Sequence, residues 1–168
     1  MSLIIAAIAP VLIFLFFVYR KDLHKEPAKL LAKCFFGGFL AIPLTLGFVA
    51  LTKSWGAHLT NPIAVSFFDS FMQAAIPEEL SKWIILYWIV WKSNDFDERY
   101  DGIIYAVFVS LGFALVENIM YVIEGGLGVA LLRSILSVPG HGFFGVLMGY
   151  YLSLAKFSPA DRRQPLIM

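Results

Sequence analysis

Residues 76–83 read Ile-Pro-Glu-Glu-Leu-Ser-Lys-Trp and place three ionisable side chains inside an otherwise apolar run. Each such residue costs about 2.5–3.5 kcal/mol at the centre of a membrane-spanning helix, so the group predicts a functional site. On a helix, Lys82 reaches either Glu79 or Glu78, and one negative charge is left for a proton, a second cation or water to compensate. A proline followed by two glutamates also begins ordinary helices at a membrane interface, so the rest of the chain must decide.

The composition is that of an integral membrane protein. Of the 168 residues, 60% are hydrophobic and 15% are charged, and the mean hydropathy is +0.78. The net charge of +1 and the lack of a nucleic-acid-binding motif exclude nucleic acid as a partner. The single cysteine, Cys34, excludes an intramolecular disulfide. The expected surroundings are therefore the lipid bilayer.

The apolar runs predict an all-α, polytopic membrane helical bundle that forms a single domain over residues 1–168. Helix breaks are expected near Pro77 and Pro139, which lie inside apolar runs. Residues 62–69 are expected to form an interfacial or partly inserted approach, and 156–168 a short flexible tail. The five predicted transmembrane helices are 3–19, 30–52, 70–91, 102–123 and 134–155.

The basic residues predict the orientation of these five spans. With the N-terminus outside, the inner segments 20–33, 92–101 and 156–168 carry five, two and three lysines or arginines. The outer segments 53–61 and 124–133 carry one each. This asymmetry favours an N-out, C-in topology.

The polar residues inside three of the spans agree in depth. The outer ends of these spans are marked by Asp69, Glu124 and Arg133. Glu78, Glu117 and His141 lie nine, seven and eight residues inward, which at about 1.5 Å per residue gives depths of roughly 13, 10 and 12 Å. Independent helix starts have no reason to agree in this way, so the three spans are expected to deliver their ionisable groups to one layer.

Glutamates with a histidine, and with no serine or cysteine nucleophile beside them, indicate the activation of water. Glu79, Glu117 and His141 could hold a divalent metal ion such as Zn²⁺, with Glu78 taking a proton from the bound water. In the alternative without a metal, one glutamate activates water directly while His141 and Asn118 stabilise the oxyanion. Two carboxylates and one imidazole are a small zinc ligand set, and both mechanisms stay open.

Several blocks of the chain resemble the PrsW family of polytopic intramembrane proteases, which are often described as metalloproteases. The matching blocks are Glu78-Glu79-Leu80-Ser81-Lys82 (E-E-x-x-K), Phe113 with Glu117-Asn118 (F-x-x-x-E-N), His141, and Asp22 with Glu26-Pro27. The resemblance covers residues 20–152 and implies catalytic roles for Glu78, Glu79, Lys82, Glu117, Asn118 and His141. It also implies a multi-pass protein of a prokaryotic cell membrane that cuts a single-span membrane protein near the outer face. The best-known such role is first-site cleavage of an anti-sigma factor in an envelope stress response.

Three alternatives accompany this reading. The wider superfamily includes CAAX-type prenyl endopeptidases, but their second motif carries a histidine where this chain has Glu117. Acidic residues beside helix breaks also occur in small proton- or ion-coupled transporters, although these usually show inverted repeats and none is evident here. In a third alternative, the polar residues only pair the helices of a membrane scaffold. Gly145 and Gly149 match a small-xxx-small pattern, which serves either internal helix packing or a homodimer.

Overall fold

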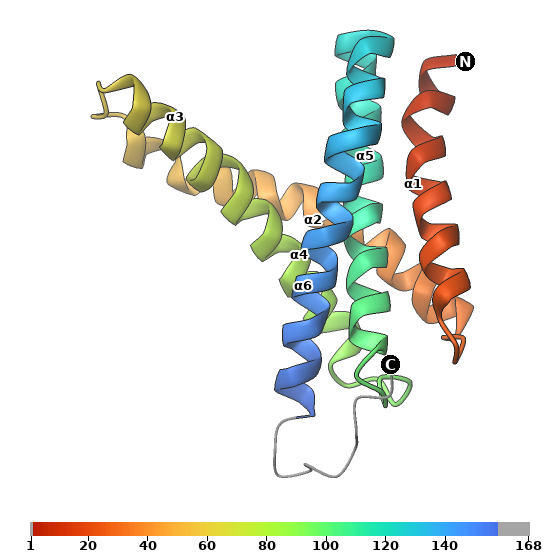
Figure 1. Ribbon diagram of the computed structural model, residues 1–168. Coiled ribbons are helices and arrows are strands. Elements are labelled where there is room, and N and C mark those ends of the chain that lie inside the picture. The colour runs from red at the N-terminus through yellow and green to blue at the C-terminus, as the bar shows by residue number, and fades with distance from the viewer. Residues whose placement is uncertain (1, 158–168) are drawn as a thin grey trace.

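The computed structural model describes residues 2–157, and every regular element among them is helical (Figure 1). The predicted tail therefore lies almost wholly outside the described residues. The elements are α1 (Ser2–Lys21), α2 (Ala28–Thr52), the 3-10 turn η1 (Lys53–Gly56), α3 (Pro62–Ser70), the π-helical segment η2 (Phe71–Ala75), α4 (Ile76–Val90), α5 (Asp101–Leu132), the π-helical segment η3 (Arg133–Ser137) and α6 (Val138–Lys156).

Helix α5 is the centre of the bundle. The residues from Ile104 to Leu115 are almost all buried and almost all apolar, on every face of the helix. Helices α1, α2, α4 and α6 surround it, and Figure 1 shows α1, α5 and α6 standing together while α2 and the α3–α4 pair cross them obliquely. A helix that is apolar on all faces is stable only when other helices cover it, as here.

Glycines allow the helices around α5 to approach closely. A Cβ on Gly38 of α2 would collide with the α5 backbone at Val109 and Phe113, and one on Gly112 would collide with the Phe35 carbonyl. On the other side of α5, Gly149 lies against the backbone of Gly102 and cannot accept a side chain either. Gly145 and Gly149 therefore serve internal packing between α5 and α6, one of the two roles predicted for them.

Three described stretches are long and apolar enough to span a membrane, namely Leu3–Lys21, Ala28–Gly56 and Asp101–Lys156. The last is 56 residues long but is not one rod, because Gly126 has φ 73° and ψ −161°. Only glycine adopts this conformation readily, and beyond it the chain returns so that α6 lies along α5 (Figure 1). The predicted spans 102–123 and 134–155 fall in these two limbs. The predicted span 70–91 is not among the three, and it contains Glu78, Glu79 and Lys82.

Neither predicted helix break occurs. Pro77 is the second residue of α4 and Pro139 the second residue of α6, and the backbone before each stays helical. A proline removes one backbone donor and its ring clashes with the carbonyl four residues earlier, and a wider π turn relieves that clash. The segments η2 and η3 provide such turns, each one residue before its proline.

Residues 62–69 do not form the separate interfacial segment that was expected. The helix α3, capped by the Asn61 side chain, continues through η2 into α4.

A second group of polar residues lies where α1 ends and α5 begins, and we call it the end cluster: Asp22, Glu26, Asp101 and Tyr105. All four are buried, and the Tyr105 hydroxyl donates to the Glu26 carboxylate. Asp101 accepts from the backbone amides of Asp97 and Glu98 at 3.1 and 2.6 Å. Burial raises the pKa of Glu26 to about 7; the nearby carboxylates add to the rise and the Tyr105 hydroxyl opposes it.

Candidate active site

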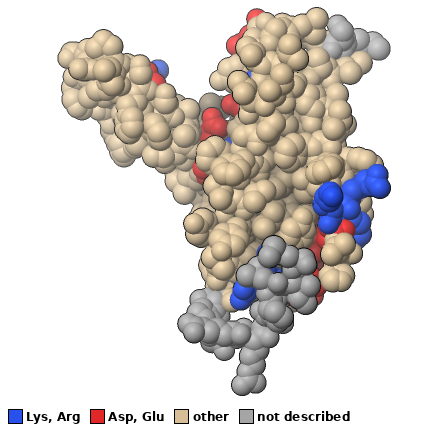
Figure 2. Space-filling view, viewed as in Figure 1, with Lys and Arg blue, Asp and Glu red and all other residues tan. Residues whose placement is uncertain are grey.

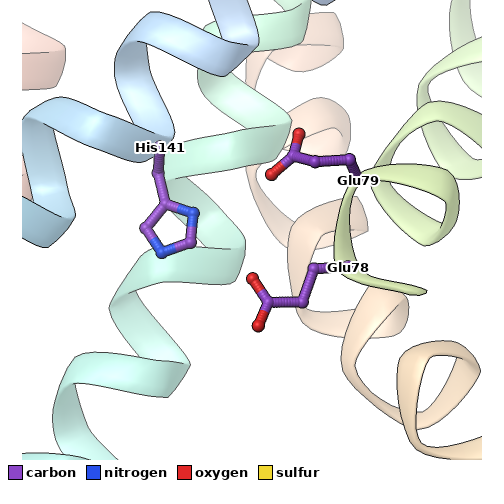
Figure 3. A group of neighbouring side chains, drawn as sticks. All are labelled: Glu78, Glu79 and His141. Atoms are coloured by element: carbon purple, nitrogen blue, oxygen red, sulfur yellow. The ribbon is translucent and has the colours of Figure 1, made fainter. Parts of the chain in front are cut away.

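The ionisable residues predicted to share a layer do meet in the middle of the bundle. Glu78 and Glu79 lie in the first turn of α4, Glu117 lies on α5, and His141 lies in the first turn of α6. Figure 3 shows His141 pointing from α6 toward both glutamates of α4. Glu78, Glu79 and His141 each offer one donor atom, and these atoms lie within 4.8 Å of one another. Figure 2 shows acidic atoms at the base of a notch between the arm that contains α3 and the rest of the molecule.

The two helices that carry these side chains begin in the same way. In each, a five-residue π segment is followed by one aliphatic residue, a proline, and then the functional side chain within two residues. A π turn changes the direction in which the following side chains point, and such turns are common at functional sites. The sequence therefore positions Glu78, Glu79 and His141 through matching local devices on α4 and α6.

Lys82 joins the two helices. Its Nζ donates to Glu79 Oε1 at 2.7 Å and to His141 Nδ1 at 3.0 Å, and it lies 3.7 Å from Glu78 Oε2. The side chain is fully buried and its ammonium stands 4.2 Å from the centre of the Phe113 ring. A buried ammonium is stable only when paired, and here two carboxylates, an imidazole and an aromatic face do so.

The hydrogen bonds of His141 assign its tautomer. An ammonium can only donate, so Nδ1 must accept from Lys82 with its lone pair. Nε2 then carries the proton and donates to Glu117 Oε2 at 3.0 Å. Glu117 therefore orients the ring from behind and presents Nδ1 to the α4 glutamates, which is how a carboxylate commonly supports a metal-binding histidine.

Arg133 was not predicted to belong to the site. Its sequence position suggested an outer interface residue, but its guanidinium turns inward, 2.7 Å from Glu117 Oε2 and 2.7 Å from Asn118 Oδ1, and over the Tyr121 ring. The sequence does contain one signal for this role. Arg133 lies only eight residues before His141, and the Gly126 turn separates it from Glu117. Arg133 balances the charge of Glu117, so the negative charge by which Glu78 and Glu79 exceed Lys82 is still left.

Asn118 has a different place from the one expected. Its side chain accepts from Arg133 and its amide faces the Ala7 carbonyl of α1 at 3.4 Å, and it is almost fully buried. It is therefore engaged on the far side of Glu117 and holds Arg133 instead of facing the donor group. The expected oxyanion role for Asn118 has no support in this arrangement.

The donor group fits a divalent ion in its chemistry but differs from the expected ligand set in one residue. Two carboxylates and an imidazole whose unprotonated nitrogen faces them are ligands that zinc accepts. Glu78 takes the place expected for Glu117, because the Glu117 carboxylate lies on the other side of the imidazole and is bonded to His141 Nε2 and Arg133. With three carboxylates against two cations and a neutral imidazole, one negative charge remains to attract an ion.

Apolar helices that enclose carboxylates, an imidazole and buried cations define a polytopic membrane protein with a centre suited to hydrolysis. A family model described as PrsW family intramembrane metalloprotease matches residues 26–168. The chain belongs to this family, and it is a protease and a multi-pass protein of the bacterial cell membrane. No solved structure matches it.

Curated relatives agree over nearly the whole chain. Protease PrsW of Bacillus subtilis (strain 168) is 41% identical over 163 residues, which are 96% of this chain and 72% of that protein. The same-named protein of Geobacillus kaustophilus is 38% identical, over 96% of this chain and 70% of its own length, and that of Clostridioides difficile is 36% identical, over 100% and 73%. These findings favour neither the prenyl endopeptidase nor the transporter.

Proposed function

We propose that this protein cleaves a single-span membrane protein within the bilayer, near its outer face, and that Glu78, Glu79 and His141 form the hydrolytic centre. The observation that carries the proposal is the meeting of three donor atoms from α4 and α6 around one point, with Glu117 orienting the imidazole. First-site cleavage of an anti-sigma factor, known in the family that the motifs resemble, is the role we infer for it.

Each residue of the hydrolytic centre has its own role. Glu79 and His141 Nδ1 hold the attacking water. A divalent ion such as Zn²⁺ would be held by these two residues and one oxygen of Glu78, whose second oxygen stays available to take a proton. When bound, such an ion polarises the scissile carbonyl and makes its water acidic. Glu78 is the carboxylate least engaged by Lys82, at 3.7 Å against 2.7 Å for Glu79, so it accepts the proton of the water and passes it to the leaving amine.

The remaining residues stabilise charge. The Lys82 ammonium contacts both Glu79 and His141, and from this place it can stabilise the oxyanion of the tetrahedral intermediate. Glu117 holds the tautomer of His141, and Arg133 holds Glu117. A route without a metal uses the same residues, with Glu78 as the direct base.

We infer five spans with the N-terminus outside and the C-terminus inside. Support comes from the reversal at Gly126, which divides the long α5–α6 stretch into two limbs, and from the helix running through α3, η2 and α4. Because Arg133 turns into the site, the outer segments lose one of their two basic residues, which strengthens the asymmetry in charge.

The test is a cleavage assay in proteoliposomes with a tagged single-span reporter. E79A and H141A should abolish cleavage, while E124A, which removes an exposed carboxylate from the same protein, should not. The assay is run with and without a chelator, and bound metal is measured by elemental analysis of each variant. Cleavage by a folded E79A protein would overturn the assignment. Cleavage that survives the chelator would instead select the route without a metal.

A further inference from the structure

The Lys82 ammonium lies among the candidate metal ligands and not beside them. Its Nζ is 2.7 Å from Glu79 Oε1, 3.0 Å from His141 Nδ1 and 3.7 Å from Glu78 Oε2. It thus touches each residue that offers a donor atom to the group. An ion that bound these residues would need the place that the ammonium occupies.

The distances from the Lys82 Nζ to the donors suit an ammonium. A charge-assisted hydrogen bond from an ammonium is about 2.7–2.9 Å long, whereas a zinc ion stands about 2.0–2.2 Å from a nitrogen or oxygen ligand. Glu79 Oε1 and His141 Nδ1, at 2.7 and 3.0 Å from Nζ, lie at hydrogen-bond distance. A divalent ion in the place of Nζ would require these two donors to close in by about 0.6–0.9 Å, and Glu78 Oε2, at 3.7 Å, by more.

The ammonium is also held in this place by its surroundings. The Lys82 side chain is fully buried, and the Phe113 ring, itself 2% exposed, lies beneath the ammonium at 4.2 Å. Phe113 is the first residue of the F-x-x-x-E-N block, whose glutamate orients His141. The motif residues of α4 and α5 therefore converge on placing a lysine nitrogen at the centre of the donor group.

We infer that Lys82 is the resident cation of this donor group and that a divalent ion binds only by displacing its ammonium. Both cations cannot share the place, because a unit charge and a divalent ion at contact distance repel strongly in a buried site. Lys82 thereby weakens the ion's affinity and makes the ion exchangeable. The inference rests on the donor group of the proposed function, but not on proteolysis itself.

Binding of Co²⁺ to the metal-free, detergent-purified full chain tests this directly. Visible absorption reports the coordination of the ion, and equilibrium dialysis gives its affinity. Lys82→Met removes the ammonium and keeps the apolar stem, so Co²⁺ should bind about tenfold more tightly or better, as expected when two charge-assisted hydrogen bonds no longer compete. Lys82→Arg keeps the charge, adds bulk and should bind more weakly than the wild type. Lys53→Met removes an exposed charge outside the site and should leave the affinity unchanged.

Thermal unfolding gives a second readout. Without the ion, Lys82→Met should unfold at a lower temperature than the wild type, because the carboxylates lose a counter-charge. Added Co²⁺ should raise its unfolding temperature more than that of the wild type. If Lys82→Met does not fold, the affinity of Lys82→Arg decides. Equal affinity in wild type and both Lys82 variants, weaker binding in Lys82→Met, or no Co²⁺ binding by any of them would overturn the inference.

The outcome is separable from that of the proposed function. If Lys82→Met binds Co²⁺ more tightly but the wild type cleaves no single-span reporter, the displacement stands and proteolysis of that substrate class fails. If the wild type cleaves the reporter and the Lys82 variants bind Co²⁺ as it does, the protease stands and the displacement fails.

Discussion

The site and the end cluster are both acidic groups inside an apolar protein, and they differ in what compensates the charge. At the site, the carboxylates of Glu78 and Glu79 face Lys82 and remain 20% and 28% exposed. In the end cluster, Glu26 is 8% exposed and its partner is the hydroxyl of Tyr105. Ionised side chains balanced by cations and open to water can move protons, whereas buried acids bonded to hydroxyl and backbone donors fix the chain in place.

This comparison assigns opposite consequences to neutral substitutions in the two places. One uncompensated negative charge at the site destabilises the folded protein, and functional sites often keep such a destabilising group because activity needs it. The end cluster ties the α1–α2 loop to the start of α5 and contains none of the residues of the donor group. Neutral substitutions of the Glu78 or Glu79 carboxylate should therefore change activity and spare stability, and those in the end cluster should do the reverse.

Among substitutions that test this contrast, Glu78→Gln should have the largest effect on cleavage. The amide has the shape of the carboxylate but cannot accept the proton of water, so cleavage should fall by about 10²–10⁴-fold. The unfolding temperature should stay the same or rise, because the change removes the surplus negative charge of the site. Reporter cleavage and thermal unfolding of the same preparations measure both. A Glu78→Gln protein that loses stability along with activity would contradict the contrast between the two clusters.

Arg133→Met should have the next largest effect. Without the guanidinium, Glu117 loses the cation at 2.7 Å and no longer holds the imidazole of His141 in one orientation. Loss of such a supporting contact typically costs about 10- to 100-fold, and here it should appear in kcat and not in KM. Arg133→Lys should restore part of the rate, because it returns the charge without the second bond to Asn118. A rise in KM alone would instead make Arg133 a residue that binds substrate.

Much of the site could be predicted because helical periodicity is local. Equal depths placed Glu78, Glu117 and His141 in one layer, and the structure brings them together. Arg133 was missed because its inward direction depends on the reversal of the chain at Gly126, where φ is 73°. The side of the imidazole that Glu117 occupies, and hence the identity of the donor atoms, depends on three helices at once and leaves no signal in spacing.

The fold, like the site, could be predicted only in part. The apolar runs predicted the helical segments, and the central role of α5 follows from its uniformly apolar surface. The prolines were expected to break helices, but the chain inserts π turns before them, a choice that depends on packing and not on the proline itself. The span 70–91 was separated from 62–69 because Asp69 looked like a boundary, while the structure continues the helix through it.

Tyr105→Phe tests the end cluster, and its expected effect is smaller than those of the two site substitutions. The substitution removes the hydroxyl that lies between the Glu26 carboxyl group and the Asp95 carbonyl, the latter at 2.9 Å, while preserving the ring. Leaving buried acceptors without their donor should lower the free energy of unfolding by about 1–3 kcal/mol. Reporter cleavage per folded molecule should not change, since Tyr105 is part of the end cluster and not of the site. A loss of activity at full stability would show that the two clusters are coupled.

The smallest effect expected is a pH dependence of stability that arises from Glu26. Its pKa in the folded protein is about 7, above the ordinary value of 4.5, so the folded state keeps a proton that the unfolded chain releases. Stability from this residue is complete below pH 4.5 and is lost as pH rises to about 7. Glu26→Gln imitates the protonated form and should flatten thermal stability across this range. If the variant keeps the wild-type slope, the pH dependence of stability does not arise from Glu26.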